Sequence, residues 1–290
     1  MTRTAIVLAC ALAPATALAE DPPAPAVADP DAADPSDLVA ASRLGLATGV
    51  GDPWPVDRAS PPAAADGALR PLSIDDTPTT IDVGHVQAEI DLAVVGYDRG
   101  DGARTVTTQV MPTRLRLGLA RRLEAQLVVV PYAAASTQVD GAETREGGYG
   151  STYGRLKLNL WGNDGGETAA ALVPFVGRTG DAWSAGLAIA GTVELGAGLV
   201  FGVVPQVEVG ADGATATTTA NVSRVVAGPV IAIAETAGRI DTLGSPWALQ
   251  ATGAVAVGVT DDAEIDAGVR RGVTGPVPDV EGFLRVSVRR

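Results

Sequence analysis

Histidine, cysteine and aromatic residues are scarce in this chain. Of its 290 residues, one is histidine, one is cysteine, and aromatic residues make up 4%. Zinc hydrolases and Cys/His nucleophile pairs need several such side chains, so the composition argues against both. The single histidine, His85, has no serine and asparagine at matching positions on the neighbouring predicted strands. We therefore expect no catalytic residues, no metal site and no cofactor.

Basic residues and long apolar runs are also in short supply. The chain has 21 basic and 34 acidic residues, a net charge of -13 and a pI near 4.5. This balance argues against a nucleic-acid partner, because phosphate contacts need a basic face. Beyond the N-terminus no apolar run reaches the roughly 18 residues of a transmembrane helix.

The N-terminus has the pattern of an export signal. Arg3 precedes the apolar stretch Ala5–Ala13, and the small residues of Ala17–Ala19 suit a signal peptidase. We predict a signal peptide over residues 1–19. Cleavage there removes the only cysteine, so the exported chain holds no disulfide.

Residues 20–75 are rich in alanine, proline and aspartate. They contain ten acidic and three basic residues and few aromatic or β-branched ones. Such a stretch buries too little apolar surface to offset the entropy lost on ordering. The sequence predicts a disordered periplasmic linker over 20–75.

From residue 76 to residue 290 the pattern changes to strict alternation. His85–Leu92, Arg155–Leu160 and Leu284–Val288 alternate polar and apolar side chains, as strands with two different faces do. About twelve such segments of roughly 9 to 13 residues follow one another, which suits tilted strands that cross a bilayer. We predict an all-β fold over 76–290, an antiparallel up-and-down transmembrane β-barrel.

The connections and the aromatic residues suggest its orientation. Short turns are expected at one end and longer loops at the other, the longest at Ala133–Gly150, as in outer-membrane barrels. Seven aromatic residues lie near the predicted long loops, where a membrane-interface girdle is expected. They are Tyr97, Tyr132, Tyr149, Tyr153, Phe175, Trp183 and Trp247.

Charged residues on the strands should face the interior, because a basic side chain in lipid costs roughly 2–4 kcal/mol near the midplane. Two of the predicted strands carry basic residues, and two strands beside them carry acidic residues. A second group of acidic residues lies on later strands, roughly opposite the basic group in the closed barrel. These side chains form either a selective constriction or a salt-bridged network that fills a narrow lumen. The candidates are Glu89, Asp91, Arg114, Arg116, Glu124, Arg155, Lys157, Glu194, Glu208, Glu264 and Asp266.

Several motifs resemble a known family. Gly84–Glu89, Pro112–Gly118, Glu124–Tyr132 and Leu156–Gly166 are similar to segments of the transporters called the "MetA-pathway of phenol degradation" family. The resemblance covers about residues 70 to 290. It implies a porin-like barrel that passes small, often aromatic, solutes.

The sequence therefore predicts a non-enzymatic channel in a Gram-negative outer membrane that passes small solutes passively. Its expected partners are membrane lipid, lipopolysaccharide, the barrel assembly machinery and small-molecule solutes. Two alternatives remain open at this stage. One is a non-conducting barrel with a structural or adhesive role, and the other is a soluble secreted β-sandwich.

Overall fold

The computed structural model describes residues 77–100, 102–211, 213–242, 247–274 and 277–290. The predicted signal peptide and linker lie outside these residues. All regular elements in the described ranges are β-strands, as the alternation requires. They are β1 (Val86–Gly100), β2 (Ala103–Val110), β3 (Thr113–Ala120), β4 (Leu123–Val130), β5 (Tyr132–Val139), β6 (Ala142–Gly148), β7 (Ser151–Trp161), β8 (Thr168–Thr179), β9 (Ala182–Gly196), β10 (Leu199–Gly210), β11 (Gly213–Ala227), β12 (Val230–Asp241), β13 (Ala248–Thr260), β14 (Ala263–Thr274) and β15 (Val280–Arg289).

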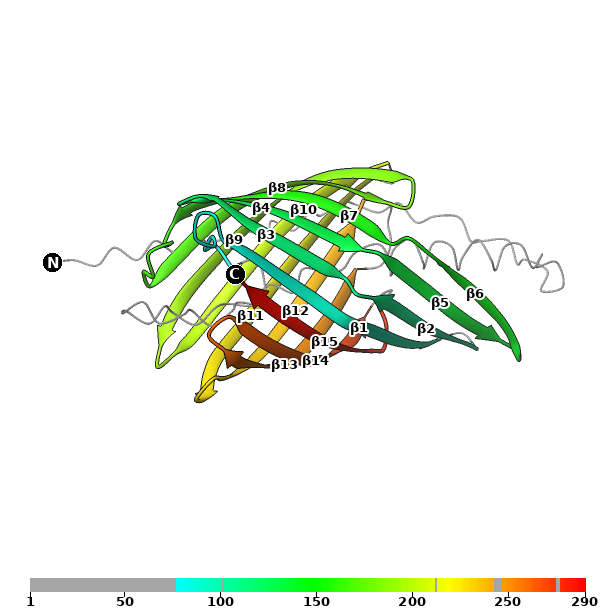
Figure 1. The fold of residues 1–290 in the computed structure, drawn as a ribbon. Coiled ribbons are helices and arrows are strands. Elements are labelled where there is room, and N and C mark those ends of the chain that lie inside the picture. The colour runs from blue at the N-terminus through cyan, green and yellow to red at the C-terminus, as the bar shows by residue number, and fades with distance from the viewer. Residues whose placement is uncertain (1–76, 101, 212, 243–246, 275–276) are drawn as a thin grey trace, which may run out of the picture.

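Twelve of these strands form a closed antiparallel barrel (Figure 1). Around the wall the order is β1, β3, β4, β7 and then β8 to β15, and β15 pairs back onto β1. Because the sheet closes, each of the twelve wall strands has a neighbour on both sides, as lipid requires. The prediction of an all-β barrel of about twelve strands is confirmed.

The remaining three strands prolong the wall at the end opposite the C-terminus (Figure 1). β2 pairs with the second half of β1 and with β5, and β5 pairs with β6. Each continues a wall strand beyond a break: Met111–Pro112 between β2 and β3, Pro131 between β4 and β5, and Tyr149–Gly150 between β6 and β7. Proline has no N–H for the ladder, so two of these breaks have a direct chemical cause.

The predicted long loop at Ala133–Gly150 is wrong. This segment is a hairpin of β5 and β6 that turns at Asp140 and Gly141, both with positive φ, which is typical of tight two-residue turns. At the same end only two residues separate β8 from β9 and two separate β10 from β11. At these three connections the excess length lies in longer strands rather than in loops.

The two faces of the wall differ as the alternation predicts. On β3, Arg116 is 3% exposed and faces the interior, whereas Leu115 and Leu117 on the outer face are 41% and 40% exposed. The same division holds on β7, where Arg155 and Lys157 are buried and the leucines between and beside them are exposed. An apolar outer face around a polar interior is typical of membrane barrels.

The aromatic girdle is only partly as expected. Tyr97, Tyr132, Tyr149, Trp183 and Trp247 are exposed. Tyr153 and Phe175, by contrast, are buried on the inner face, with their rings edge to face and the centroids 6.2 Å apart. Both lie at strand positions whose side chains point inward. The prediction used only their proximity to a loop end, which does not set the direction of the side chain.

Candidate functional site

The densest group of charges inside the barrel centres on Glu124 of β4. Both of its carboxylate oxygens accept hydrogen bonds from Arg116 of β3, Oε1 from Nε at 2.7 Å and Oε2 from Nη2 at 2.9 Å. The Lys157 ammonium of β7 lies 3.8 Å from Oε1, and Gln126 donates to the same oxygen at 2.8 Å. Glu124 and Lys157 are both fully buried. Such paired contacts are the geometry in which buried charge is tolerated.

Glu89 of β1 extends this group across two strands. Its Oε1 lies 3.4 Å from Arg116 Nη1 and its Oε2 lies 3.5 Å from Arg114 Nη1. Gln87 donates to Oε1 at 3.0 Å. Arg116 therefore bridges Glu89 and Glu124, and the contacts join β1, β3, β4 and β7 into one network, which we call the Glu124 network.

The segment before the first strand, Thr77–Gly84, lies against this network inside the barrel. The Ile81 N–H donates to Glu124 Oε2 at 2.9 Å, and Asn159 Nδ2 of β7 donates to the Pro78 carbonyl at 2.9 Å. The Thr80 N–H donates to Asn163 Oδ1 at 2.8 Å. We call this segment the strap, because it crosses the inner face of β3, β4 and β7 and is hydrogen-bonded to side chains there.

A glycine makes room for the strap. Gly118 of β3 occupies an inward position, and a Cβ built there would lie 2.1 Å from the carbonyl oxygen of Asp82. Its carbonyl accepts a hydrogen bond from the N–H of Gly84, the last residue of the strap, at 2.9 Å, and its N–H donates to the carbonyl of the next residue, His85, at 3.1 Å. Any other residue at 118 would push the strap away from the wall.

A second charged group spans the closing pair of strands. Arg285 of β15 donates to both carboxylate oxygens of Asp91 of β1, at 2.6 Å and 3.2 Å. Asp266 of β14 lies in the same row, directly opposite Arg285 in the β14–β15 register, and it is fully buried. The row places a cation between two carboxylates.

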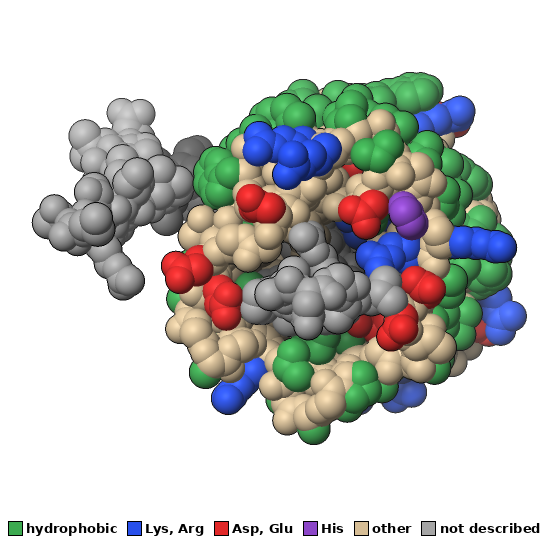
Figure 2. Space-filling model, turned by 60° about the vertical axis from the view of Figure 1, so that its left-hand side comes forward, with side chains coloured by type: hydrophobic (Ala, Val, Ile, Leu, Met, Phe, Trp, Pro, Cys, Tyr) green, Lys and Arg blue, Asp and Glu red, His purple; other side chains and the backbone are tan. Residues whose placement is uncertain are grey.

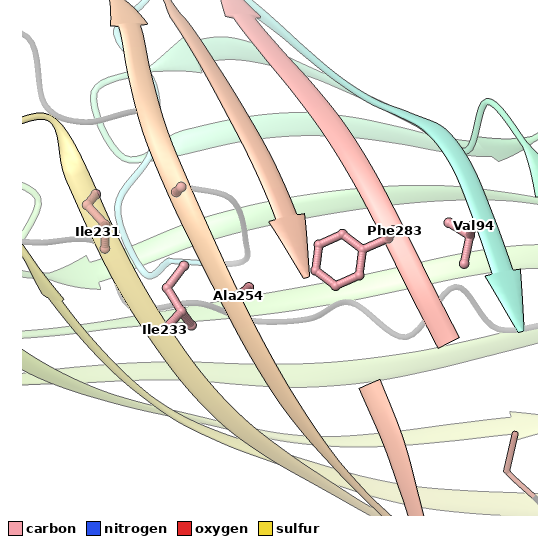
Figure 3. Close-up of a cluster of buried hydrophobic side chains, with 6 residues drawn as sticks. Val94, Ile231, Ile233, Ala254 and Phe283 are labelled. Atoms are coloured by element: carbon pink, nitrogen blue, oxygen red, sulfur yellow. The ribbon is translucent and has the colours of Figure 1, made fainter. Parts of the chain in front are cut away.

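Two further rows follow along the same wall, and Figure 3 shows side chains of the first, apolar one. The next row is apolar and runs through Ile233, Ala254, Gly268, Phe283 and Val94, on β12, β13, β14, β15 and β1. The Phe283 ring covers the glycine, since a Cβ at 268 would lie 2.4 Å from its Cζ.

The row beyond is polar again. Arg270 of β14 pairs with Glu281 of β15, and its guanidinium lies 4.7 Å from the centre of the Phe283 ring. Glu235 of β12 accepts from Thr252 of β13 at 3.4 Å. An apolar belt therefore lies between two charged rows on the inner wall.

The other predicted site residues are dispersed. Arg155 faces inward on β7, 6.0 Å from the Phe175 ring. Glu264 is buried on β14, three strands around the wall from Arg114 and Arg116. Glu194 on β9 and Glu208 on β10 are half-buried. The structure thus brings together Glu89, Arg114, Arg116, Glu124 and Lys157 in one network and Asp91 with Asp266 in another.

Sequence reasoning missed several inward residues. Arg285 and Phe283 share the inward parity of Ser287 in the last strand, so the alternation contained the signal for both. Arg270 and Glu281 form a pair between β14 and β15 that only the register reveals. The inward parity of Glu235 follows from β12 itself, where Ile231, Ile233 and Ala237 are also buried.

The end of the barrel that holds the C-terminus has charged residues of both signs around its rim, and apolar side chains cover the outer wall (Figure 2). Among the described residues, no three or more His, Cys, Asp or Glu side chains are grouped to hold a metal ion. No helix in the described ranges is long and apolar enough to span a membrane.

These features define a class: a closed twelve-stranded barrel with an apolar outer face and a charged interior, the fold of outer-membrane channels. The chain is similar to the crystal structure of an outer membrane channel from Pseudomonas putida F1, with a TM-score of 0.60 and 11% identity, over 74% of this chain and 98% of that one. It is also similar to the KdgM porin in complex with disordered oligogalacturonate (TM-score 0.44, 7% identity, 71% and 97% covered) and to the NanC porin (0.45, 10%, 70% and 98%).

At these identities the likeness concerns the fold, and the argument rests on the first of the three. No family model and no curated protein sequence matches the chain. The resemblance to the phenol-degradation transporters therefore stays a prediction.

Proposed function

We propose that this protein is an outer-membrane channel that passes small solutes passively, with charged side chains inside the barrel setting its selectivity. One observation carries the proposal: the closed twelve-stranded wall is apolar outside, while buried acids and bases line the inside. This pattern argues against a soluble β-sandwich, in which the apolar side chains face the core and the charged ones face water. In this wall the ion pairs are buried inside and rows of leucine are exposed outside. The location in the outer membrane, with lipid and lipopolysaccharide around the wall, is part of the proposal.

The aromatic side chains of the inner face support small aromatic solutes as the substrate class. Phe283, Tyr153 and Phe175 are buried on the inner face. Arg270 and Arg155 lie over two of these rings. A ring-shaped solute with a polar substituent can stack on such a surface and bind to the neighbouring charges.

A second candidate function is a non-conducting barrel with a structural or adhesive role. The strap favours it, because Thr77–Gly84 occupies part of the interior and is hydrogen-bonded to the inward side chains of Glu124 and Asn159 and to Asn163 in the turn after β7. In that case the Glu124 network seals the barrel rather than selecting solutes.

Single-channel recording in planar bilayers separates the two candidates. The wild-type chain is expected to give discrete conductance steps. Arg155→Glu is expected to shift the preference toward cations by several-fold, because it reverses a charge on the inner face. Arg224→Glu is the matched control, since Arg224 is exposed on β11, and it should leave selectivity unchanged. Silent bilayers with well-folded protein would refute the channel and leave the structural role.

The closing pair of strands gives a prediction about stability. Arg285→Gln should lower the free energy of unfolding by about 3–5 kcal/mol, because two buried carboxylates lose the cation between them. Urea unfolding in detergent micelles measures this change. The double variant Asp91→Asn/Arg285→Gln should recover part of the loss, whereas Arg178→Ala, at an exposed pair with Asp181, should have little effect. Equal destabilisation by Arg285→Gln and Arg178→Ala would contradict the prediction.

A further inference from the structure

Two prolines lie in the middle of wall strands, where a closed sheet gives them no edge to occupy. Pro174 is the seventh of twelve residues of β8, and Pro205 is the seventh of twelve residues of β10. Both are exposed on the outer face. Proline is normally confined to edge strands, because it cannot donate to the ladder. In lipid no water replaces the missing donor.

The pairing is interrupted at both prolines. Between β9 and β10 the register passes from Val203↔Gly191 to Gln206↔Ala188, so Val204 and Pro205 make no ladder pair with β9. On their other sides both strands pair without a gap, Pro205 with Thr218 of β11 and Pro174 with Leu187 of β9.

The second interruption lies on the other edge of the same hairpin. Between β7 and β8 the register passes from Arg155↔Phe175 to Leu158↔Leu172, so Pro174 makes no pair with β7. The β8–β9 hairpin therefore has an interrupted ladder along each of its edges, at nearly the same height. This arrangement weakens the attachment of one hairpin to the rest of the wall.

Of the two interruptions, only that between β9 and β10 has no charged side chain at the unpaired positions or directly beside them, although Gln206 is a buried polar side chain on its inner face. On its inner side Ala188 and Ala190 are fully buried and Val204 nearly so, in one cluster with Ala171 and Val173. On its outer side Leu187, Ile189 and Val207 are exposed. The seam between β7 and β8 has Arg155 and Lys157 on its inner side instead.

We propose that the β9–β10 seam at Pro205 is a lateral opening, through which small apolar solutes pass between the interior of the barrel and the surrounding bilayer. This inference rests on the proposed channel function and adds a second route to it. No charged side chain lines the seam at the interruption itself, so an apolar solute crosses there at little desolvation cost. Separation of the strands there breaks fewer hydrogen bonds than elsewhere, and the weak β7–β8 ladder lets the hairpin move.

A disulfide across the seam tests the proposal while keeping Pro205. Leu187 and Val207 are direct register partners on the outer face, next to the interruption. We would introduce Leu187→Cys/Val207→Cys on a Cys10→Ala background and express the chain in a Gram-negative host. The readout is the initial rate at which the apolar dye 1-N-phenylnaphthylamine enters the outer membrane and fluoresces. Swelling of liposomes in arabinose measures the axial route of the same purified variant.

The control disulfide is Val222→Cys/Ala234→Cys. These residues are register partners on the outer face of the β11–β12 ladder, which is continuous from Thr215 to Val225 and carries Asn221 and Glu235 on its inner side. Oxidation of the seam variant is expected to lower dye entry severalfold and dithiothreitol to restore it, with swelling unchanged. Oxidation of the control should alter neither rate. Unchanged dye entry in the oxidised seam variant, or an equal loss in the control, would overturn the lateral opening.

A single substitution provides an independent test without oxidation. Pro205→Val restores an N–H that can pair with β9, so it should slow dye entry while the barrel becomes more resistant to heat. Dye entry no faster than in cells without the protein, together with normal arabinose swelling, refutes the lateral opening but leaves the channel. Absence of both swelling and conductance refutes the channel and the opening with it.

Discussion

The variant Gly118→Ala is expected to raise the single-channel conductance roughly two- to threefold, because it displaces the strap that narrows the interior. A Cβ at position 118 would lie 2.1 Å from the backbone carbonyl oxygen of Asp82. Because Asp82 belongs to the strap, this clash can be relieved only if the strap moves. The overpacking should also cost roughly 1–3 kcal/mol of stability. Planar-bilayer recording measures the conductance, and the temperature at which the compact gel band is lost measures stability.

The matched control for this prediction is Gly154→Ala. Gly154 lies in β7, and a Cβ there would meet no atom within 4 Å. The control therefore changes the same residue type in a wall strand without touching the strap. An unchanged conductance in Gly118→Ala, with the protein folded, would show that the strap does not limit the flow of ions.

Glu124→Ala is expected to destabilise the barrel strongly. It leaves Arg116 and Lys157 buried without their shared carboxylate, a loss of about 3–5 kcal/mol. It also removes the acceptor of the Ile81 N–H, so the strap should loosen and the conductance should rise. Loss of the heat-modifiable gel band at lower temperature measures the first effect, and bilayer recording measures the second.

Two comparisons make the prediction for Glu124 specific. Glu143→Ala removes a carboxylate from an exposed pair with Arg145 on β6, and no measurable change is expected there. The double variant Glu124→Gln/Arg116→Gln removes both charges of the closest pair, so it should be more stable than Glu124→Ala. If Glu124→Ala unfolds at the wild-type temperature, the network is not a source of stability.

The barrel could be predicted from the sequence because the alternation is local. Arg114–Leu117 alternates charged and apolar residues, so both faces of the strand and its inward arginines followed directly. The β5–β6 hairpin was missed because Thr137–Gly148 is polar on both faces. A strand that extends beyond the apolar band has no lipid side, and the pattern used to recognise wall strands is lost there.

The site was predictable in its residue types but not in its pairing. Charge and parity placed Glu89, Arg116 and Glu124 inside, and strand adjacency brought them together. Arg270 with Glu281 depended on the register across β14 and β15, which no local pattern contains. The position of the strap against the wall depends on a glycine that faces inward. Gly118 interrupts an otherwise bulky inward row, and that small residue was the available signal.

The closing pair of strands also has a consequence for the order of folding. Asp91 and Arg285 are 194 residues apart in the chain, and the wall is not continuous until they meet. The strap precedes β1 and lies inside, so it must already be in place, or be enclosed, when β15 joins β1. The hydrogen bonds between β15 and β1 then close the wall with the strap inside it. Contacts so distant in sequence are made slowly, so barrel assembly ends with its slowest step.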